Sequence, residues 1–260
     1  MTRSHDAVVQ EQYAPRAKAY VESAVHAAGD DLAVLEAIAA REQPERAADL
    51  GTGGGHVAYR LARHARAVTA IDLSAAMLEA VGDEARQRGI ANIEICAAPA
   101  EAMPIEDATF DMLGCRFSAH HWRDFEAGIR EARRVLKPGA TALFIDVVSP
   151  EYAPFDTHLQ AVELLRDPSH VRNYTEAEWG STLARSGFRI CATQKRRLRM
   201  EWQTWVDRMR TPETHREAIR SLQQRASAET TAYFAIEPDG SFSFDTVQIE
   251  ATACRARSLR

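Results

Sequence analysis

The sequence predicts an α/β fold in which helices cover both faces of a mostly parallel β-sheet. From residue 46 to about residue 147, short apolar runs alternate with amphipathic stretches, which is the order expected for parallel strands joined by helices. The first run ends in an acid and closely spaced glycines, and the second ends in another acid about twenty residues past this loop. With 260 residues, 45% of them hydrophobic, the chain is long enough to bury a core.

Two amphipathic helices are expected before the sheet. Apolar residues recur at helical spacing over residues 6–27 and again over residues 31–41. Helices at this place in the chain are positioned to cap a ligand that binds at the edge of the sheet.

The first strand and the turn after it form the most informative stretch. Residues 47–55 read Ala-Ala-Asp-Leu-Gly-Thr-Gly-Gly-Gly, so a strand ends near Asp49 and meets alternate glycines, Gly51, Gly53 and Gly55. Glycine lets the backbone pass close to a ligand, and the following helix turns its first N–H groups toward it. We therefore expect a nucleoside cofactor here, and the alternative is a tight turn that binds nothing. The sequence does not match the dinucleotide-binding fingerprint, because His56 occupies the position of its third glycine.

A second acid stands at the end of the next strand. Residues 68–74, Val-Thr-Ala-Ile-Asp-Leu-Ser, place Asp72 beside the tip of the first strand if the two strands are parallel neighbours. A carboxylate at this point can accept hydrogen bonds from both hydroxyls of a ribose. The alternative is that Asp72 caps the next helix, a role that Ser74 can fill alone.

The remaining elements follow from the same patterns. Strands are expected over residues 46–50, 67–72, 92–97, 109–116, 140–147, 188–199 and 241–254. Helices are expected over 125–136 and, beyond Pro150, over 154–166, 175–186 and 201–234. In the last strand, Phe242 and Phe244 share one parity, whereas Val247 and Ile249 share the other. This switch predicts a bulge or bend at Asp245 and Thr246.

Composition argues against several classes of function. A formal net charge of −5 provides no basic field for nucleic acid. The four cysteines are far apart and the histidines lack metal-binding spacing, so we expect neither disulfides nor a metal site. The sequence shows no signal peptide and no apolar run of about 20 residues, which predicts a cytoplasmic protein without membrane insertion. The oligomeric state is left open, a homodimer included.

Several motifs between residues 45 and 150 occur together. They are the glycine loop, Asp72, Ala-Glu-Ala-Met-Pro-Ile at 100–105, Phe-Asp at 110–111 and Arg-Val-Leu-Lys-Pro-Gly at 134–139. Together they resemble the type 11 family of class I S-adenosylmethionine-dependent methyltransferases, relatives of the enzymes that C-methylate ubiquinone and menaquinone precursors. Segments 165–172 and 211–213 are similar to a bacterial subgroup. The resemblance implies a Rossmann-like sheet with an antiparallel last strand.

The resemblance also implies a cofactor and its contacts. S-adenosylmethionine would bind with its methionine end at Asp49 and the glycine loop, its ribose at Asp72, and its adenine along Ala100 and Glu101. S-adenosylhomocysteine would be the product. The chain departs from many relatives at Pro99, where they carry an aspartate, and proline offers adenine neither a carboxylate nor an N–H.

These assignments suggest how the chain is organised. We expect a single methyltransferase domain over residues 1–260, divided into capping helices at 1–45, a cofactor-binding core at 46–148, and substrate-lid helices with closing strands at 149–260.

The loop after the fourth strand supplies candidates for the chemistry. Arg116 ends the strand and is expected to face the cofactor, and His120 and His121 follow at the edge where ligands of α/β folds bind. An oxygen or nitrogen acceptor must usually lose a proton, and histidine suits this task because its ordinary pKa is near 6.5. Asp146, near the tip of the next strand, is expected to orient one imidazole. The alternative is that the two histidines only shape the pocket.

A second polar cluster lies in the helical insertion. His170, Arg172 and Tyr174 are expected to contact the methyl acceptor from a lid. The alternative is that Arg172 pairs with a nearby carboxylate and His170 merely packs. The sequence therefore predicts methyl transfer to the oxygen, nitrogen or carbon of a small, partly apolar molecule. Its rivals are a nicotinamide-dependent oxidoreductase and a protein that binds S-adenosylmethionine without turnover.

Overall fold

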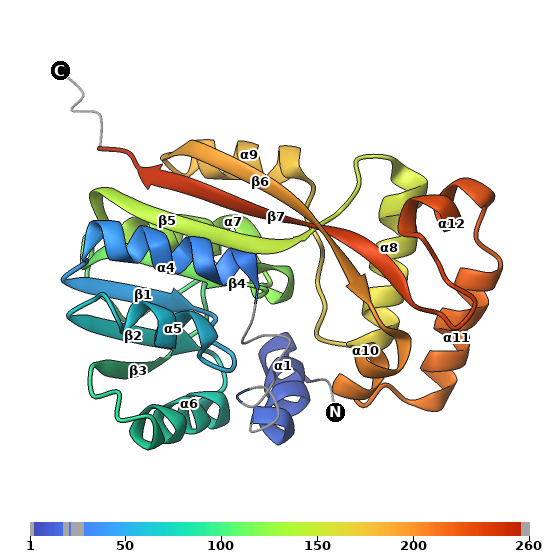
Figure 1. Ribbon diagram of the computed structural model, residues 1–260, viewed down its shortest axis with the longest axis horizontal. Coiled ribbons are helices and arrows are strands. Elements are labelled where there is room, and N and C mark those ends of the chain that lie inside the picture. The colour runs from blue at the N-terminus through green and yellow to red at the C-terminus, as the bar shows by residue number, and fades with distance from the viewer. Residues whose placement is uncertain (1–2, 18–20, 22–28, 256–260) are drawn as a thin grey trace.

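The computed structural model describes residues 3–17, 21 and 29–255 and confirms the predicted α/β fold. Seven strands form one sheet in the order β3-β2-β1-β4-β5-β7-β6 (Figure 1). The pairs from β3 to β5 are parallel, and β7 runs antiparallel to both of its neighbours. The strands are β1 (Arg46–Leu50), β2 (Ala67–Asp72), β3 (Ile93–Ala97), β4 (Phe110–Arg116), β5 (Leu136–Val148), β6 (Phe188–Met200) and β7 (Phe242–Ala253).

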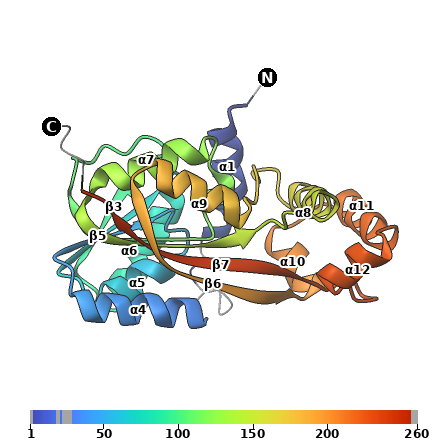
Figure 2. The same cartoon turned by 90° about the horizontal axis from the view of Figure 1, so that it is seen from above.

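Helices cover both faces of the sheet. They are α4 (Asp30–Glu42), α5 (His56–Leu61), α6 (Ala75–Gln87), α7 (Phe125–Val135) and α9 (Glu176–Arg185). Figure 2 shows α7 and α9 on one side of the sheet and α4 and α5 on the other. Each layer buries its own apolar cluster, with Phe125 of α7 and Trp179 of α9 in one and Leu32 and Leu35 of α4 in the other. This burial provides the main stabilisation of the fold.

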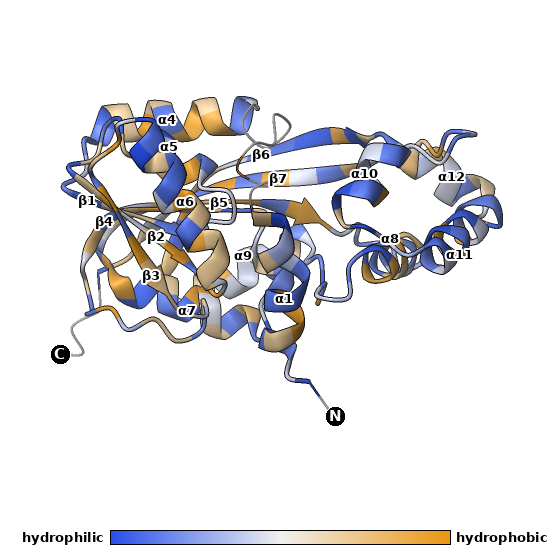
Figure 3. Cartoon of the chain, turned by 90° about the horizontal axis from the view of Figure 1, so that it is seen from below, coloured by the Kyte–Doolittle hydropathy of each residue, from blue (hydrophilic) through white to orange (hydrophobic). Residues whose placement is uncertain are grey.

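A separate group of helices packs where β5, β6 and β7 extend beyond the other strands (Figure 1). We call this group the lid: α8 (Ala153–Arg166), α10 (Trp202–Arg208), α11 (Glu213–Gln224) and α12 (Ala228–Phe234). A third apolar cluster joins it to the strands, through Phe242 and Phe244 of β7, Trp205 of α10 and Ile219 of α11. Figure 3 shows that much of β6 is hydrophilic, in contrast to the strands at the centre of the sheet.

The first predicted helix, over residues 6–27, is only partly described. Its beginning is α1 (His5–Tyr13), followed by a 3-10 turn, η1 (Ala14–Arg16). Residues 18–20 and 22–28 of this prediction lie outside the described residues. The Gln10 side chain donates a hydrogen bond to the Leu73 carbonyl (3.5 Å), which ties α1 to the end of β2.

The prediction of one helix over 201–234 is wrong in detail, because three helices occupy this stretch. Arg210 adopts a φ of 50°, and Pro212 follows as the residue before α11. Ser227 then begins α12 by accepting a hydrogen bond from the Thr230 N–H (3.2 Å). Positive φ, proline and a capping serine each interrupt a continuous helix.

A bulge or bend was predicted at Asp245 and Thr246, and the bulge is absent. β7 pairs with β5 without a register shift through this region. Phe244 faces the lid cluster, whereas Val247 faces the layer of α7 and α9. The parity switch therefore marks a change in which face of a regular strand is covered. The register shift lies in β6, between Ile190 and Ala192.

Candidate active site

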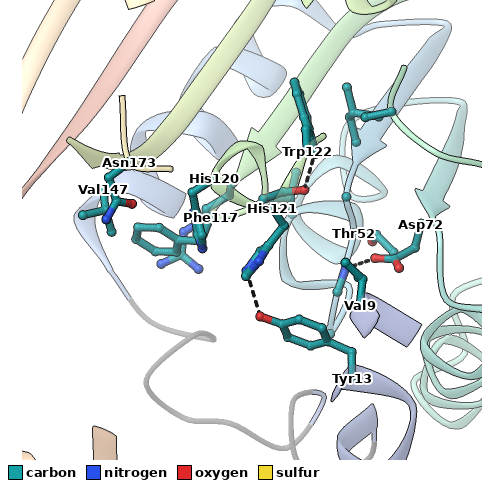
Figure 4. Close-up of a pocket in the computed structure, with 18 of the residues that line it drawn as sticks. Val9, Tyr13, Thr52, Asp72, Phe117, His120, His121, Trp122, Val147 and Asn173 are labelled. Atoms are coloured by element: carbon teal, nitrogen blue, oxygen red, sulfur yellow. Dashed lines mark hydrogen bonds between the residues drawn. The ribbon is translucent and has the colours of Figure 1, made fainter. Parts of the chain in front are cut away.

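A cavity of about 360 Å³ opens at the carboxyl ends of β1, β2 and β4. We call the part lined by residues up to Arg123 the loop end and the part lined by residues from Val147 onward the lid end. The glycine loop and α1 line the loop end, and β6, β7, α8 and α10 line the lid end. Figure 4 shows His120 between Asp72 on one side and Val147 on the other.

The glycine loop leaves room for a ligand at its centre. Gly51 has a φ of 69°, and a Cβ there would lie 1.8 Å from Ser118 Oγ, so any side chain is excluded. Gly53 has a φ of 50°, lines the cavity, and a Cβ there would meet nothing within 4 Å. Gly55 precedes α5 with a φ of 80° and is not among the residues that line the cavity. The open approach to the backbone at Gly53 fits a nucleoside cofactor.

Asp49 stabilises this loop through hydrogen bonds. Its Oδ2 accepts hydrogen bonds from Thr52 Oγ1 (2.6 Å) and from the Ala58 N–H (2.9 Å). Burial raises the pKa of Asp49 to about 7, although these two donors oppose the rise. Asp49 also lines the cavity, so the residue that holds the loop lies next to the ligand space.

Asp72 connects the loop to the next helix. Its Oδ2 accepts from the Gly53 N–H (2.9 Å) and its Oδ1 from the Ser74 N–H (2.8 Å). Burial raises the pKa of Asp72, and these backbone donors oppose the rise. Ser74 caps α6 itself by accepting from the Met77 N–H (3.3 Å). Since each carboxylate oxygen has a second lone pair, the side chain that lines the cavity still has sites for ribose hydroxyls.

Ala100, Glu101 and Arg116, the other residues assigned to the cofactor, also line the cavity. Glu101 accepts a weak hydrogen bond from the Asp124 N–H (3.3 Å). The Arg116 guanidinium donates to Asp31 (2.5 Å), and both side chains are buried. This ion pair fixes Arg116 at the end of β4.

His120 forms a buried pair with Asp146. The distance from His120 Nδ1 to Asp146 Oδ1 is 2.6 Å, and the two side chains are 16% and 2% exposed. Burial lowers the pKa of His120, but the charge and hydrogen bond of Asp146 outweigh it and raise the pKa above its ordinary value. His120 lines the cavity, whereas Asp146 lies behind it. The expected pairing of a loop imidazole with Asp146 is therefore present in the geometry.

Protein groups occupy both ring nitrogens of His121. Its Nε2 lies 2.8 Å from the Tyr13 hydroxyl (Figure 4), and its Nδ1 lies 3.1 Å from the Ser169 carbonyl. Burial and the neighbouring His120 lower the pKa of His121 to about 4. His121 therefore stays neutral near pH 7 and joins α1 to the segment after α8.

The three residues of the predicted substrate cluster do not line the cavity. His170 Nε2 lies 2.9 Å from Gln160 Oε1, and burial lowers the pKa of His170 to about 2. Arg172 pairs with Asp156 (3.2 Å). Tyr174 stacks on Phe125, with 4.0 Å between ring centroids. The ion pair of Arg172 and the burial of His170 match the alternative in which Arg172 pairs with a carboxylate and His170 packs, and contact with an acceptor stays a prediction.

The lid end contains polar residues that sequence reasoning did not select. Glu163, Asn173 and Arg196 all line it. A signal for Arg196 was visible, since it shares strand parity with Leu198 and Met200 and thus occupies a position that faces an apolar interior. No pattern marked Asn173 or Glu163, because their positions depend on how the lid packs.

Within residues 3–17, 21 and 29–255, no group of three or more His, Cys, Asp or Glu side chains is arranged to hold a metal ion. Within the same residues, no helix has the length and apolar character needed to cross a membrane.

Comparison with known proteins places this geometry in context. A model of the methyltransferase domain matches residues 48–144. The uncharacterised protein YafE of Escherichia coli K12 is 42% identical over 77% of this chain and 97% of its own length. The uncharacterised methyltransferase YcgJ of Bacillus subtilis is 30% identical over 86% of this chain and 88% of its own length.

Solved structures agree with these relatives. The crystal structure of YcgJ superposes with a TM-score of 0.83 at 28% identity, covering 87% of this chain and 99% of that chain. A putative methyltransferase from Bacillus halodurans also has a TM-score of 0.83, at 30% identity, with 87% of this chain and all of that chain covered (100%).

Proposed function

Because the chain belongs to the class I S-adenosylmethionine-dependent methyltransferases, we propose that it methylates an oxygen or nitrogen atom of a small, partly apolar molecule, with His120 as general base. The observation that carries this proposal is the His120–Asp146 pair on the cavity wall, between the loop end and the lid end. A group that approaches the loop end from the lid passes this imidazole.

The loop end fits the cofactor. The open backbone at Gly53 and the carboxylate of Asp72 would hold the nucleoside, and Asp49 would face its methionine part. When bound, the cofactor supplies an electrophilic methyl group, so the lone pair of the acceptor forms the new bond to carbon while the electrons of the broken carbon–sulfur bond stay on sulfur. The chain contributes by holding the two reactants in line.

The task of His120 is to receive the proton that the acceptor loses. Asp146 accepts at Nδ1, so Nδ1 carries the proton of the neutral ring and Nε2 is the basic nitrogen. The Val147 N–H donates to the same carboxylate oxygen (2.8 Å) and holds it in place. A raised pKa makes His120 a stronger base than a free imidazole.

His121 is poorly suited to this task. Its Nδ1 lies against the Ser169 carbonyl and its Nε2 against the Tyr13 hydroxyl, which also donates to Asp167 (3.0 Å), so both ring nitrogens are occupied by protein groups. Since a pKa of about 4 makes it a weak base, we assign His121 to positioning α1 against the site.

The shape of the cavity favours turnover over simple binding of the cofactor. A cofactor-binding protein without activity would close the space beyond the methyl group. Here the cavity continues past His120 to apolar side chains of the lid end, including Leu198, Met200 and Trp205. This continuation provides space for a partly apolar acceptor.

The test replaces His120 with glutamine and compares this variant with His64→Gln. His64 lies outside the cavity, near Glu36 (3.6 Å). Radioactive methyl transfer from S-adenosylmethionine to 2-naphthol and 2-naphthylamine is measured, together with calorimetric cofactor affinity. We expect His120→Gln to lower transfer by about 100-fold or more without changing cofactor affinity. Full activity in His120→Gln would refute the role of His120 as general base. Absence of cofactor binding would refute the proposed function.

A further inference from the structure

Charge differs between the residues that line the loop end and those that line the lid end. Among the described residues that line the loop end are six carboxylates, Asp6, Asp30, Asp31, Asp49, Asp72 and Glu101, against two arginines, Arg116 and Arg123. The lid end has one carboxylate, Glu163, against four arginines, Arg166, Arg196, Arg197 and Arg208. The acidic loop end suits a cofactor with a positive sulfonium, and the lid end, where an acceptor would lie, has the opposite sign.

Two of these four arginines pair with a carboxylate of the described chain, whereas Arg196 does not. Arg166 pairs with Glu163 (3.4 Å), and Arg197 pairs with Asp245 (3.0 Å). The Arg196 guanidinium instead donates to two neutral amides, Gln248 Oε1 (2.9 Å) and Gln194 Oε1 (2.7 Å). No carboxylate of the described chain pairs with Arg196, so its charge is held in place without being neutralised.

The position of Arg196 in β6 places this residue on the wall of the cavity. Side chains alternate along a strand, so Arg196 shares a face with Leu198 and Met200, which line the lid end with it. Arg196 is the neighbour of Thr246 in β7, and Thr246 is the neighbour of Val147 in β5. All three residues of this row line the cavity.

This row begins next to the partner of the proposed base. Val147 directly follows Asp146, the partner of His120, although the side chains of Val147 and Asp146 point to opposite faces of β5. Two strand spacings, roughly 10 Å, separate the backbones of Val147 and Arg196. Thr246 lies between them, and the apolar pair Leu198 and Phe244 lines the cavity one cross-strand pair further along the same face, with Met200 and Trp205 also in the lining. The lining of the cavity therefore includes the imidazole of His120, a cation at Arg196 and apolar side chains beside Arg196.

We propose that the methyl acceptor is an apolar anion whose carboxylate or phosphate binds Arg196 while its hydroxyl or amino group is methylated beside His120. This inference rests on the proposed function. Guanidinium can form two parallel hydrogen bonds to such an anion. A neutral acceptor would remove water from Arg196 and leave its charge unpaired, whereas an anionic acceptor would compensate it.

The test measures calorimetric affinity for three probes in the presence of saturating S-adenosylhomocysteine. 6-Hydroxy-2-naphthoate carries both groups, 2-naphthol lacks the anion, and 2-naphthyl phosphate distinguishes phosphate from carboxylate. We expect at least one anion to bind about tenfold or more tightly than 2-naphthol. Arg196→Gln should remove this preference. Arg189→Gln is the matched control, because Arg189 lies in the same strand, is exposed and does not line the cavity.

Three results would overturn the inference: equal affinity for 2-naphthol and the anions, no binding of either anion, or an unchanged preference in Arg196→Gln. Unchanged affinity of Arg196→Gln for S-adenosylhomocysteine verifies that the variant is folded. Failure of the proposed function gives a different result, since cofactor binding or the effect of His120→Gln on methyl transfer would then be missing.

Discussion

Replacing Asp72 with alanine tests the assignment of the ribose. In the free protein this carboxylate accepts from the Gly53 N–H (2.9 Å) and the Ser74 N–H (2.8 Å), so these bonds are lost whether or not the cofactor is present. The ribose hydroxyls would lose a charged acceptor only in the complex. Hydrogen bonds to charged groups contribute about 1.5–3 kcal/mol. Losing one ribose bond therefore predicts binding weaker by more than about tenfold, or about 1.4 kcal/mol.

The assay is calorimetric titration of Asp72→Ala with S-adenosylhomocysteine, and Asp111→Ala is its control. Asp111 also accepts a backbone hydrogen bond, from the Arg46 N–H (3.0 Å), and it binds Lys137 (2.6 Å), but it does not line the cavity. The control should retain normal affinity. Unchanged affinity in Asp72→Ala, or an equal loss in Asp111→Ala, would refute the reasoning.

Two further predictions concern the base and the loop. The rate of S-adenosylhomocysteine formation is measured from pH 5 to 9. It should be low at pH 5, where His120 is protonated and cannot act as a base, and rise with pH. The midpoint should lie above 6.5, because Asp146 raises the pKa of His120. Asp146→Asn should lower that midpoint, and an unmoved midpoint would contradict the pairing. In thermal unfolding, Gly51→Ala should be more destabilising than Gly53→Ala, since its Cβ would lie 1.8 Å from Ser118 Oγ, whereas Gly53 has free space. The reverse order would contradict the loop geometry.

Local patterns were sufficient for the sheet and for the loop end. β1 and β2 have their expected bounds, because each is a short apolar run that ends at an acid and a turn. The same acids, Asp49 and Asp72, hold the glycine loop through hydrogen bonds to neighbours within about twenty residues. Contacts this local leave a signal in a single stretch of sequence.

The lid end could not be predicted in this way. Arg196 and Trp205 reach it from β6 and α10, and Asn173 from the segment after α8. Their convergence depends on the antiparallel pairing of β6 with β7 and on lid packing, which local periodicity does not encode. The polar cluster expected at His170, Arg172 and Tyr174 lay close to the right place in sequence, but the residue that lines the cavity there is Asn173.

The wall around His120 is incomplete within the described chain. Asp146 Oδ2, His170 Nδ1 and Asn173 Nδ2 are buried without a hydrogen-bond partner among the described residues. The rings of His170 and His120 lie 5.8 Å apart, and Gln160 Oε1 binds both His170 Nε2 and the Asn173 N–H, so the three atoms belong to one polar wall. Each unsatisfied group costs about 1–3 kcal/mol.

The cost of the unsatisfied polar atoms and the charge of Arg196 have the same explanation. A side chain chosen only for stability at these positions would be apolar or fully bonded. Instead, Asn173, which lines the cavity, has an unsatisfied amide Nδ2, and Arg196, which lines the same cavity, has no carboxylate partner among the described residues. An acceptor with a polar reacting group at one end and an anion at the other accounts for both departures, whereas a site that bound only the cofactor accounts for neither.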